Sequence, residues 1–280
     1  MDISKIKALR EETGLGMLEV KKALSEANDD LEKAREILSS QTIKKADTTR
    51  VASKGLTRIT TKGNEAILFE VNAETDFVAK HKDFIQLLDD LADVLMNSKA
   101  ITVKDANKVM IGDITVEQHI QKVSNIIKEN AFLRRFHRIK KQDHQVFQTY
   151  MHQQGKVSVL VILNEANVLG KDLALQITSH APKYLSYDLL DQETINYERF
   201  MYEKEHGTIS DEDFIKHLRT QCLYDQPFIK DDQMCVKDVM KDLKVIDFYR
   251  FELGQGIENK LNCRLDVPCD GSKITVTPIY

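Results

Sequence analysis

The stretch Ala66-Ile67-Leu68-Phe69-Glu70-Val71-Asn72 has the β-branched and aromatic composition of a strand. A second strand-like run, Leu56-Thr57-Arg58-Ile59-Thr60, precedes it, and Lys62-Gly63-Asn64-Glu65 between the two is typical of a hairpin turn. Thr75-Asp76-Phe77-Val78-Ala79-Lys80 follows and leads into a long helical pattern over residues 84–95. This order predicts an antiparallel hairpin and then a helix, with an Asp-Phe pair at the corner between them.

Further strands and helices are expected downstream. Residues 132–139, 146–151 and 157–163 are strand candidates, and the last is nearly all apolar, as in the centre of a sheet. Helices are predicted at 116–128, 171–180, 191–205, 210–222 and 236–243, and later strands at 245–251 and 273–277. Periodicity predicts that the first two core helices bury Val78, Ile85, Leu88, Ala92, Leu95, Ile120, Val123, Ile126 and Ile127.

The N-terminal residues have a different pattern. Residues 2–39 read as three short helices, because apolar residues recur at helical spacing. Two glycines in Thr13-Gly14-Leu15-Gly16 predict a tight turn, and Asn28-Asp29-Asp30 predicts a helix stop followed by a new cap. Residues 41–54 are polar and rich in Lys, Thr and Ser, which is typical of a linker.

The predicted fold class is α+β. Hairpin-like strands mixed with helices favour antiparallel sheets over a doubly wound parallel sheet. The expected divisions are a three-helix domain at 1–40, a linker at 41–54, core subdomain N at 55–140, and core subdomain C at 141–280, which includes a helical hairpin at 191–222.

Composition limits the class of protein. The 280 residues suffice for about two domains, and 42% hydrophobic residues support real cores. A formal net charge of −4 argues against a dedicated nucleic-acid binder. No apolar run reaches the ~18 residues of a membrane helix, and the N-terminus has no signal-like segment. We therefore expect a cytoplasmic protein with no membrane partner.

The motifs of enzymes and metal sites are not found. Cys222, Cys235, Cys263 and Cys269 have no C-x-x-C spacing, so reduced thiols in or near the core are expected. The eight histidines form no H-E-x-x-H, and no G-x-S-x-G occurs. The two glycines near the N-terminus lack the strand and third glycine of a dinucleotide site. We expect no cofactor, no metal and no bond-making chemistry.

Two features leave alternatives open. Arg134-Arg135-Phe136-His137-Arg138-Ile139-Lys140-Lys141 is the strongest basic run. Alternation along a strand favours a solvated or protein-contacting face, but interleaved aromatic and cationic residues also occur in RNA-binding proteins. Phe77 either packs in the core beside Val78 or projects from its corner, where Asp76 is expected to cap the helix.

Longer motifs resemble a known family. Thr13-Gly14-Leu15-Gly16-Met17-Leu18-Glu19-Val20-Lys21-Lys22-Ala23-Leu24 and Glu70-Val71-Asn72-Ala73-Glu74-Thr75-Asp76-Phe77-Val78-Ala79-Lys80 are similar to the two signatures of bacterial elongation factor Ts. Shorter echoes follow in the family's order, at residues 129–135, 150–152 and 250–258. Together they span nearly the whole chain.

The resemblance implies a ubiquitin-associated-like N-terminal domain and a core of two α+β subdomains. It also implies a guanine-nucleotide exchange factor that binds elongation factor Tu·GDP, displaces Mg²⁺ and promotes GDP release so that GTP can bind. Thr75, Asp76, Phe77 and Val78 match the segment that reaches the partner's nucleotide pocket, with Phe77 as the wedge.

Other partner contacts are also implied by the resemblance, at Met17, Leu18, Lys21, Lys22, Leu133 and His152. Gln153-Gln154 stands where many members have glycines, and the chain end 275–280 does not read as a terminal helix, so the contacts of both regions are open. The hairpin at 191–222 is expected to mediate a homodimer, as in some members, or to protrude. A helical adaptor without exchange activity remains the other alternative.

Overall fold

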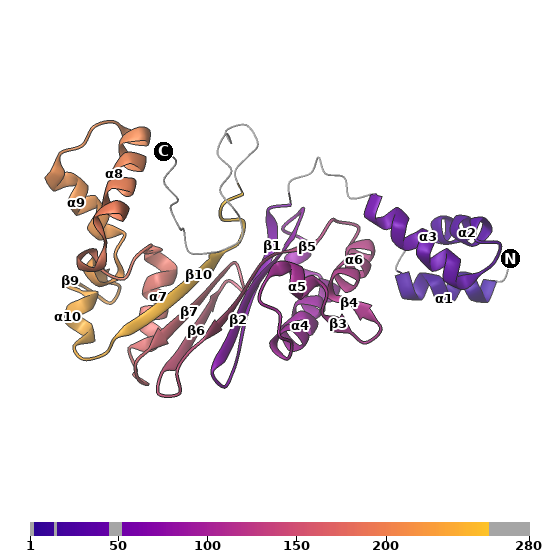
Figure 1. The fold of residues 1–280 in the computed structure, drawn as a ribbon, viewed down its shortest axis with the longest axis horizontal. Coiled ribbons are helices and arrows are strands. Elements are labelled where there is room, and N and C mark those ends of the chain that lie inside the picture. Colours follow the sequence, from indigo (N-terminus) through magenta and orange to yellow (C-terminus); the bar gives the residue numbers. More distant parts are fainter. Residues whose placement is uncertain (1–2, 14–15, 45–51, 258–280) are drawn as a thin grey trace. The chain divides into compact units, whose positions relative to one another are not determined.

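The structure is a computed structural model that describes residues 3–13, 16–44 and 52–257 (Figure 1). Its helices are α1 Ile3–Thr13, α2 Met17–Glu26, α3 Leu31–Lys44, α4 Lys82–Met96, α5 Val103–Asn107, α6 Val116–Ile127, α7 Gly170–His180, α8 Gln192–His206, α9 Asp211–Thr220 and α10 Val236–Met240, with 3₁₀ turns η1 Val78–Lys80, η2 Tyr187–Leu189 and η3 Leu223–Asp225. Its strands are β1 Lys54–Lys62, β2 Glu65–Ala73, β3 Met110–Ile111, β4 Ile114–Thr115, β5 Phe132–Lys140, β6 Val146–His152, β7 Val157–Leu163, β8 Pro227–Phe228, β9 Asp231–Cys235 and β10 Val245–Glu252. Helices mixed with antiparallel strand pairs confirm the predicted α+β class.

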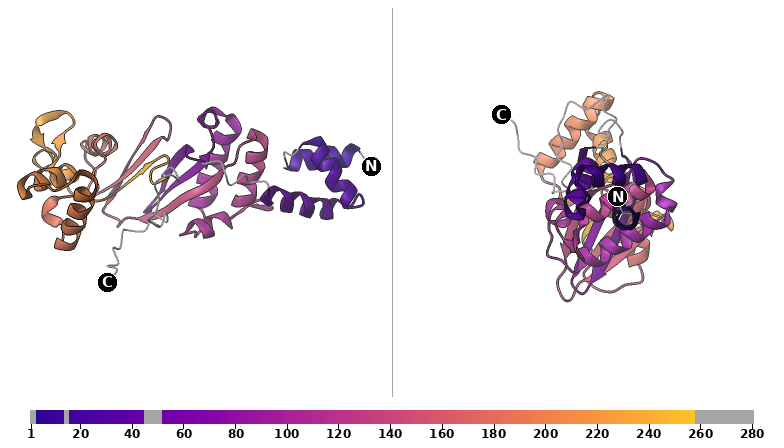
Figure 2. Two further views of the ribbon diagram at one scale, coloured as in Figure 1. Left: turned by 90° about the horizontal axis from the view of Figure 1, so that it is seen from above. Right: turned by 90° about the vertical axis from the view of Figure 1, so that its right-hand side faces the viewer.

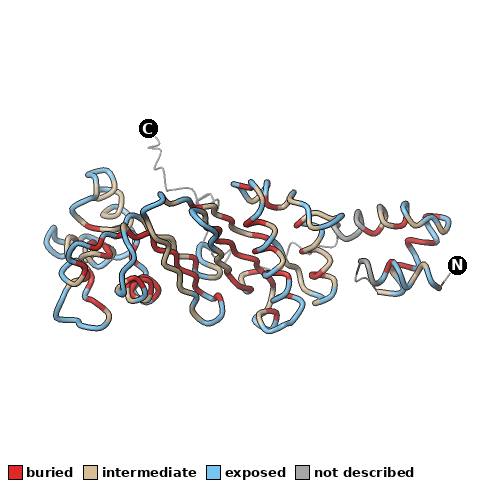
Figure 3. Tube along the Cα trace, turned by 90° about the horizontal axis from the view of Figure 1, so that it is seen from below, coloured by how far each residue is buried: buried red, intermediate tan, exposed pale blue. Residues whose placement is uncertain are grey.

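The chain divides into two compact units. Unit 1 comprises residues 1–139, 154–156 and 251–280, and unit 2 comprises residues 140–153 and 157–250. The chain therefore leaves unit 1 for unit 2 twice and returns to it both times. Each unit has a hydrophobic core of its own, and buried residues gather in the strands and on the inner faces of the helices (Figure 3).

Helices α1, α2 and α3 pack on one another at the start of unit 1. They share a separate small core of Leu9, Val20, Ala23, Leu24, Ala27, Ala34 and Leu38. Helix α3 continues to Lys44, into the stretch that was expected to be linker. Residues 45–51 lie outside the described part, and so do Gly14 and Leu15 of the predicted glycine turn.

The sheet of unit 1 has the strand order β1-β2-β5. Strands β1 and β2 form the predicted antiparallel hairpin, in register from Lys54↔Ala73 to Lys62↔Glu65, and Gly63 takes a φ of +58° in its two-residue turn. Helix α4 packs on β1 and β2, and α6 packs beside α4 (Figure 2). This arrangement explains why β2 is buried over nearly its whole length.

The sheet of unit 2 has the strand order β10-β7-β6. Every residue of β7 is buried, and this strand lies in the centre of the sheet, as its apolar composition predicts. Helix α7 packs on β6 and β7, and its side chains join a core that also includes Leu223, Val236 and Met240. Helices α8 and α9 lie where the helical hairpin was predicted.

Some details of the predicted pattern are wrong. Ile85 in α4 is 37% exposed and Ile126 in α6 is 42% exposed, although both were expected to face inward. Both lie at the margin of an apolar face that is narrower than the sequence suggested. The short elements α5, β3, β4, β8 and β9 were not predicted, and the strand predicted at 273–277 lies outside the described residues.

Among the described residues, none of the helices combines the length and the apolar character that a membrane-spanning segment needs. The same part of the chain contains no group of three or more His, Cys, Asp or Glu side chains arranged to hold a metal ion.

Candidate functional site

The turn between β2 and α4 presents Phe77 to solvent. Its side chain is 84% exposed, and the preceding Asp76 is exposed as well. The alternative in which Phe77 packs in the core is therefore wrong. An aromatic ring can bury about 150–250 Å² when it meets a partner, so a projecting phenylalanine is a strong candidate for a contact surface.

The backbone that carries this ring is well anchored. Phe77 has helical dihedrals (φ −66°, ψ −30°), and its carbonyl accepts a 3.1 Å hydrogen bond from the Lys80 amide. The next residue, Val78, is 3% exposed and belongs to the core of unit 1. One neighbour of Phe77 is thus fixed inside the protein while the ring itself points outward.

Asp76 does not cap a helix, contrary to expectation. The N-cap positions of η1 and α4 are Phe77 and His81, and neither start has a side-chain cap hydrogen bond. Strand β2 is followed by a bend and a 3₁₀ turn before α4 begins, which moves the helix start several residues beyond Asp76. The carboxylate is therefore not used at either helix end.

Two carboxylates join the Phe77 turn to the segment after α6. Glu129 Oε2 accepts a 2.8 Å hydrogen bond from the Thr75 amide, and Glu129 Oε1 accepts one of 2.5 Å from Thr75 Oγ1. In the opposite direction, Glu74 Oε1 accepts from the Asn130 side-chain amide at 2.7 Å and from its backbone amide at 3.3 Å. We call these four residues the carboxylate clamp. No roles were predicted for Glu74, Glu129 and Asn130, although all three lie in family-like motifs.

A second exposed apolar surface lies at the start of α2. Met17 is 57% exposed and Leu18 is 82% exposed, and Lys21 and Lys22 on the same helix are exposed too. Val20, Ala23 and Leu24 face the small core instead. The helix therefore combines an inner apolar face with an outer pair of apolar residues and two lysines.

Leu133 and His152 lie in different environments. Leu133 on β5 is 4% exposed and packs in the core of unit 1, so its side chain has almost no surface to offer a partner. His152, at the end of β6, is half-buried, and its Nδ1 lies 3.4 Å from the hydroxyl of Tyr150. The turn after His152 places Gln153 and Gln154 in the left-handed region, at φ +46° and +59°. Glycine would occupy both positions without strain.

The arginines of the basic run 134–141 do not form a solvated face. The side chains of Arg134, Arg135 and Arg138 are only 8%, 12% and 5% exposed. Arg134 and Arg135 both pair with Glu70, and Arg138 pairs with Glu65 at 2.7 Å. The expectation of a solvated or protein-contacting face is wrong for these arginines. The RNA-binding alternative loses the same side chains, because they are held in internal ion pairs.

Glu70 is the centre of a buried network in unit 1. Its carboxylate is completely buried and accepts hydrogen bonds from Arg134 Nη1 at 3.0 Å, Arg135 Nε at 2.6 Å and the Gly254 amide at 3.0 Å. Arg135 also donates to the Glu252 carbonyl at 2.8 Å, and its guanidinium lies 4.1 Å from the centroid of the Phe251 ring. The network joins the middle of the hairpin to residues near the end of the described chain.

The helical hairpin in unit 2 has an exposed side as well. Phe200 on α8 is 63% exposed, whereas Phe214 on α9 is fully buried. Arg199 joins the two helices through a 2.8 Å ion pair with Asp211 and lies 4.5 Å above the Phe214 ring. The hairpin is thus internally packed but leaves an aromatic side chain in water.

The described cysteines fit the prediction of reduced thiols. Cys222 is buried and Cys235 is half-buried, and neither forms a disulfide. Burial, and then the charge of Asp225, raise the pKa of the Cys222 thiol to about 12. Cys263 and Cys269 lie outside the described residues.

Comparison with known proteins gives consistent matches. A family model described as Elongation factor TS matches residues 74–255. The protein named elongation factor Ts from Acholeplasma laidlawii (strain PG-8A) is 39% identical to this chain over 279 residues, which cover 92% of this chain and 94% of that protein. The region matched by the family model begins at Glu74 and includes the exposed Phe77 turn and the whole carboxylate clamp.

Proposed function

Because this chain belongs to the elongation factor Ts family, the guanine-nucleotide exchange factors of elongation factor Tu, we propose that Phe77 is the wedge with which it opens its partner's nucleotide site. The exchange function follows from family membership: the protein acts in translation elongation, in the cytoplasm, by promoting release of GDP so that GTP can bind. The segment Thr75, Asp76, Phe77 and Val78 is the proposed site of that action.

The observation that carries the proposal is the 84% exposure of Phe77 on an anchored backbone. A ring that inserts between elements of the partner near the bound nucleotide shifts the ligands of the partner's Mg²⁺. Magnesium requires near-ideal octahedral geometry, so a small shift costs much of its binding. Asp76, exposed beside the ring, adds a negative charge that repels the phosphates of the partner's nucleotide.

The ring alone does not supply enough energy for a large acceleration. Burying one phenylalanine contributes about 1.5–3 kcal/mol, which corresponds to roughly one to two decades of nucleotide affinity. We therefore assign further binding energy to Met17 and Leu18, with Lys21 and Lys22 beside them. By linkage, the partner's nucleotide weakens the grip of this protein by the same factor as the protein weakens nucleotide binding.

The remaining assignments concern two single residues and two parts of the fold. His152 is proposed as a partner contact through its half-buried ring, and Leu133 as a separate contact position in unit 1, where its side chain is only 4% exposed. The helices α1–α3 are proposed to form a ubiquitin-associated-like domain.

The hairpin of α8 and α9 is proposed to mediate a homodimer, with Phe200 as an exposed apolar contact. Analytical ultracentrifugation of the wild type and of Phe200→Asp tests the dimer. If the hairpin mediates it, the variant sediments as a lighter species than the wild type.

The central experiment measures release of a fluorescent GDP from purified elongation factor Tu at increasing concentrations of this protein. We expect Phe77→Ala to lower the maximal release rate about tenfold or more while complex formation persists. Leu189→Ala is the control, since it removes a 70% exposed apolar side chain from unit 2, at a position with no proposed role, and leaves the rate unchanged. Full-speed release by Phe77→Ala would refute the wedge. No acceleration by the wild-type chain would favour the helical adaptor instead.

A further inference from the structure

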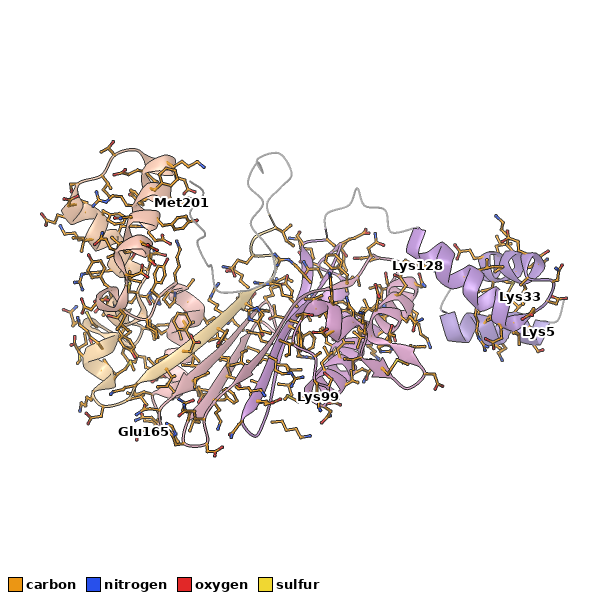
Figure 4. The ribbon with its side chains drawn as sticks, in the orientation of Figure 1. Lys5, Lys33, Lys99, Lys128, Glu165 and Met201 are labelled. Carbon is orange, nitrogen blue, oxygen red and sulfur yellow. The ribbon has the colours of Figure 1, made fainter. Side chains whose placement is uncertain are left out.

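The segment that follows α6 is fixed before it reaches the Phe77 turn. Lys128, labelled in Figure 4, ends the helix in the left-handed conformation at φ +61°. The hydroxyl of the buried Ser124 donates to the Glu129 carbonyl at 2.5 Å and accepts from the Ala131 amide at 3.3 Å. The backbone of Glu129 is therefore held by its own helix, and its side chain extends from a fixed base.

The Glu129 carboxylate then holds a residue 54 positions earlier in the chain. Both of its oxygens are occupied, one by the amide of Thr75 and the other by the hydroxyl of Thr75. An ionised carboxylate only accepts hydrogen bonds, so it suits two donors on one residue. A glutamine in its place would present an NH₂ group to one of them.

The clamp acts on the residue that precedes the Asp76-Phe77 pair. Thr75 is fixed by Glu129 on one side of the pair, and Val78 is buried in the core on the other side. Only Asp76 and Phe77 lie between these two anchors, and both are exposed. A ring held in this way enters a partner without first being ordered, and preorganisation of this kind improves binding because it lowers the entropy that must be lost.

We propose that Glu129 is a positioning residue of the exchange reaction: it holds Thr75 so that Phe77 is presented in the orientation in which it inserts. Glu74 supports the same geometry from the opposite direction through Asn130. The proposal rests on the proposed function of Phe77 as the wedge. It differs from a purely structural role because it requires Glu129 to act through the Phe77 ring.

The first test is a double-mutant cycle in the GDP-release assay. We expect Glu129→Ala to lower the maximal release rate about tenfold, a loss of ~1.4 kcal/mol, and Glu129→Gln to lower it less. In the Phe77→Ala background the same substitution has no further effect, because the ring it positions is gone. Glu165→Ala in unit 2, whose side chain is exposed and labelled in Figure 4, is the matched carboxylate control and leaves the rate unchanged.

The second test needs no partner. The chain contains no tryptophan, so Phe77→Trp introduces a single reporter at the wedge. We expect the fluorescence anisotropy of this tryptophan to fall when Glu129→Ala or Thr75→Val is added. Thr75→Ser in place of Thr75→Val keeps the hydroxyl, so the anisotropy should stay at the value of the Phe77→Trp variant.

The outcomes separate this proposal from the one before it. If Phe77→Ala slows release but Glu129→Ala does not, the positioning role is refuted and the wedge stands. Equal losses from Glu129→Ala in both backgrounds, or an unchanged anisotropy, would also refute positioning and leave a general structural role. If Phe77→Ala releases GDP at full speed while the anisotropy falls, the clamp orders the turn but the wedge itself is wrong, and the positioning role in exchange falls with it.

Discussion

Replacing Glu70 by glutamine is expected to destabilise unit 1 strongly. The carboxylate has no exposed surface, and it is the anion that Arg134 and Arg135 share. Glutamine has nearly the same shape, so the change removes one negative charge without leaving a cavity. It also replaces one acceptor oxygen by an NH₂ group, which faces donors that already point at this site.

The size of the effect follows from burial. The side chains of Arg134 and Arg135 are only 8% and 12% exposed, so their guanidinium groups cannot recover their hydration when the charge of Glu70 is lost. Removing one partner of a buried ion pair costs about 3–5 kcal/mol, because the other charge remains buried and uncompensated. We therefore expect Glu70→Gln to lower the free energy of unfolding by about 3–5 kcal/mol.

Urea titration followed by far-UV circular dichroism measures this loss. Glu165→Gln is the control, since its exposed carboxylate should change stability by less than about 0.5 kcal/mol. A variant that replaces Glu70, Arg134 and Arg135 together by leucine or methionine should lie within about 1–2 kcal/mol of wild type, because well-packed apolar groups often substitute for a buried ion network. A loss below about 1 kcal/mol for Glu70→Gln would show that the charges are hydrated and that the reasoning is wrong.

Two further predictions concern the turn after β6 and the start of α2. Gln153→Gly and Gln154→Gly should each raise the free energy of unfolding by about 0.5–1 kcal/mol, because relief of the left-handed strain exceeds the added entropy of the unfolded chain; a lower thermal midpoint in either variant would contradict this. Met17→Asp should raise the concentration of this protein needed for half-maximal GDP release about tenfold and leave the maximal rate unchanged. The substitution preserves the helix, since an acidic residue is favourable in the first turn. Met234→Asp, at an exposed methionine of unit 2, should leave both parameters unchanged, and an equal effect of the two substitutions would contradict the assignment.

Local signals in the sequence predicted much of the fold. The hairpin of β1 and β2 was predictable because two strand-like runs flank a Gly-Asn pair, and β7 because its apolar run is uninterrupted. Ile85 was misplaced because periodicity indicates which side of a helix is apolar but not how wide a face the neighbouring sheet covers.

Interactions between distant residues were not predictable in the same way. The arginines of β5 read as a surface because nothing near them in the chain indicates Glu70, which lies 64 positions before Arg134. The exposure of Phe77 was left open by spacing, and the clamp that supports it joins residues 54 positions apart. Such pairs form only when the sheet brings β2 and β5 together, so a single sequence carries no local trace of them.

The contact between Glu70 and Gly254 spans 184 positions of the chain. A ribosome that adds about 5–20 residues per second needs roughly 10–40 s to make the intervening stretch. For that time the Glu70 carboxylate lacks one of its hydrogen-bond donors. The nascent hairpin of β1 and β2 therefore cannot reach its final state, even if its two strands have already paired. Completion of unit 1 therefore waits until unit 2 has been synthesised, and a message truncated before codon 254 yields a protein whose first unit is left unfinished.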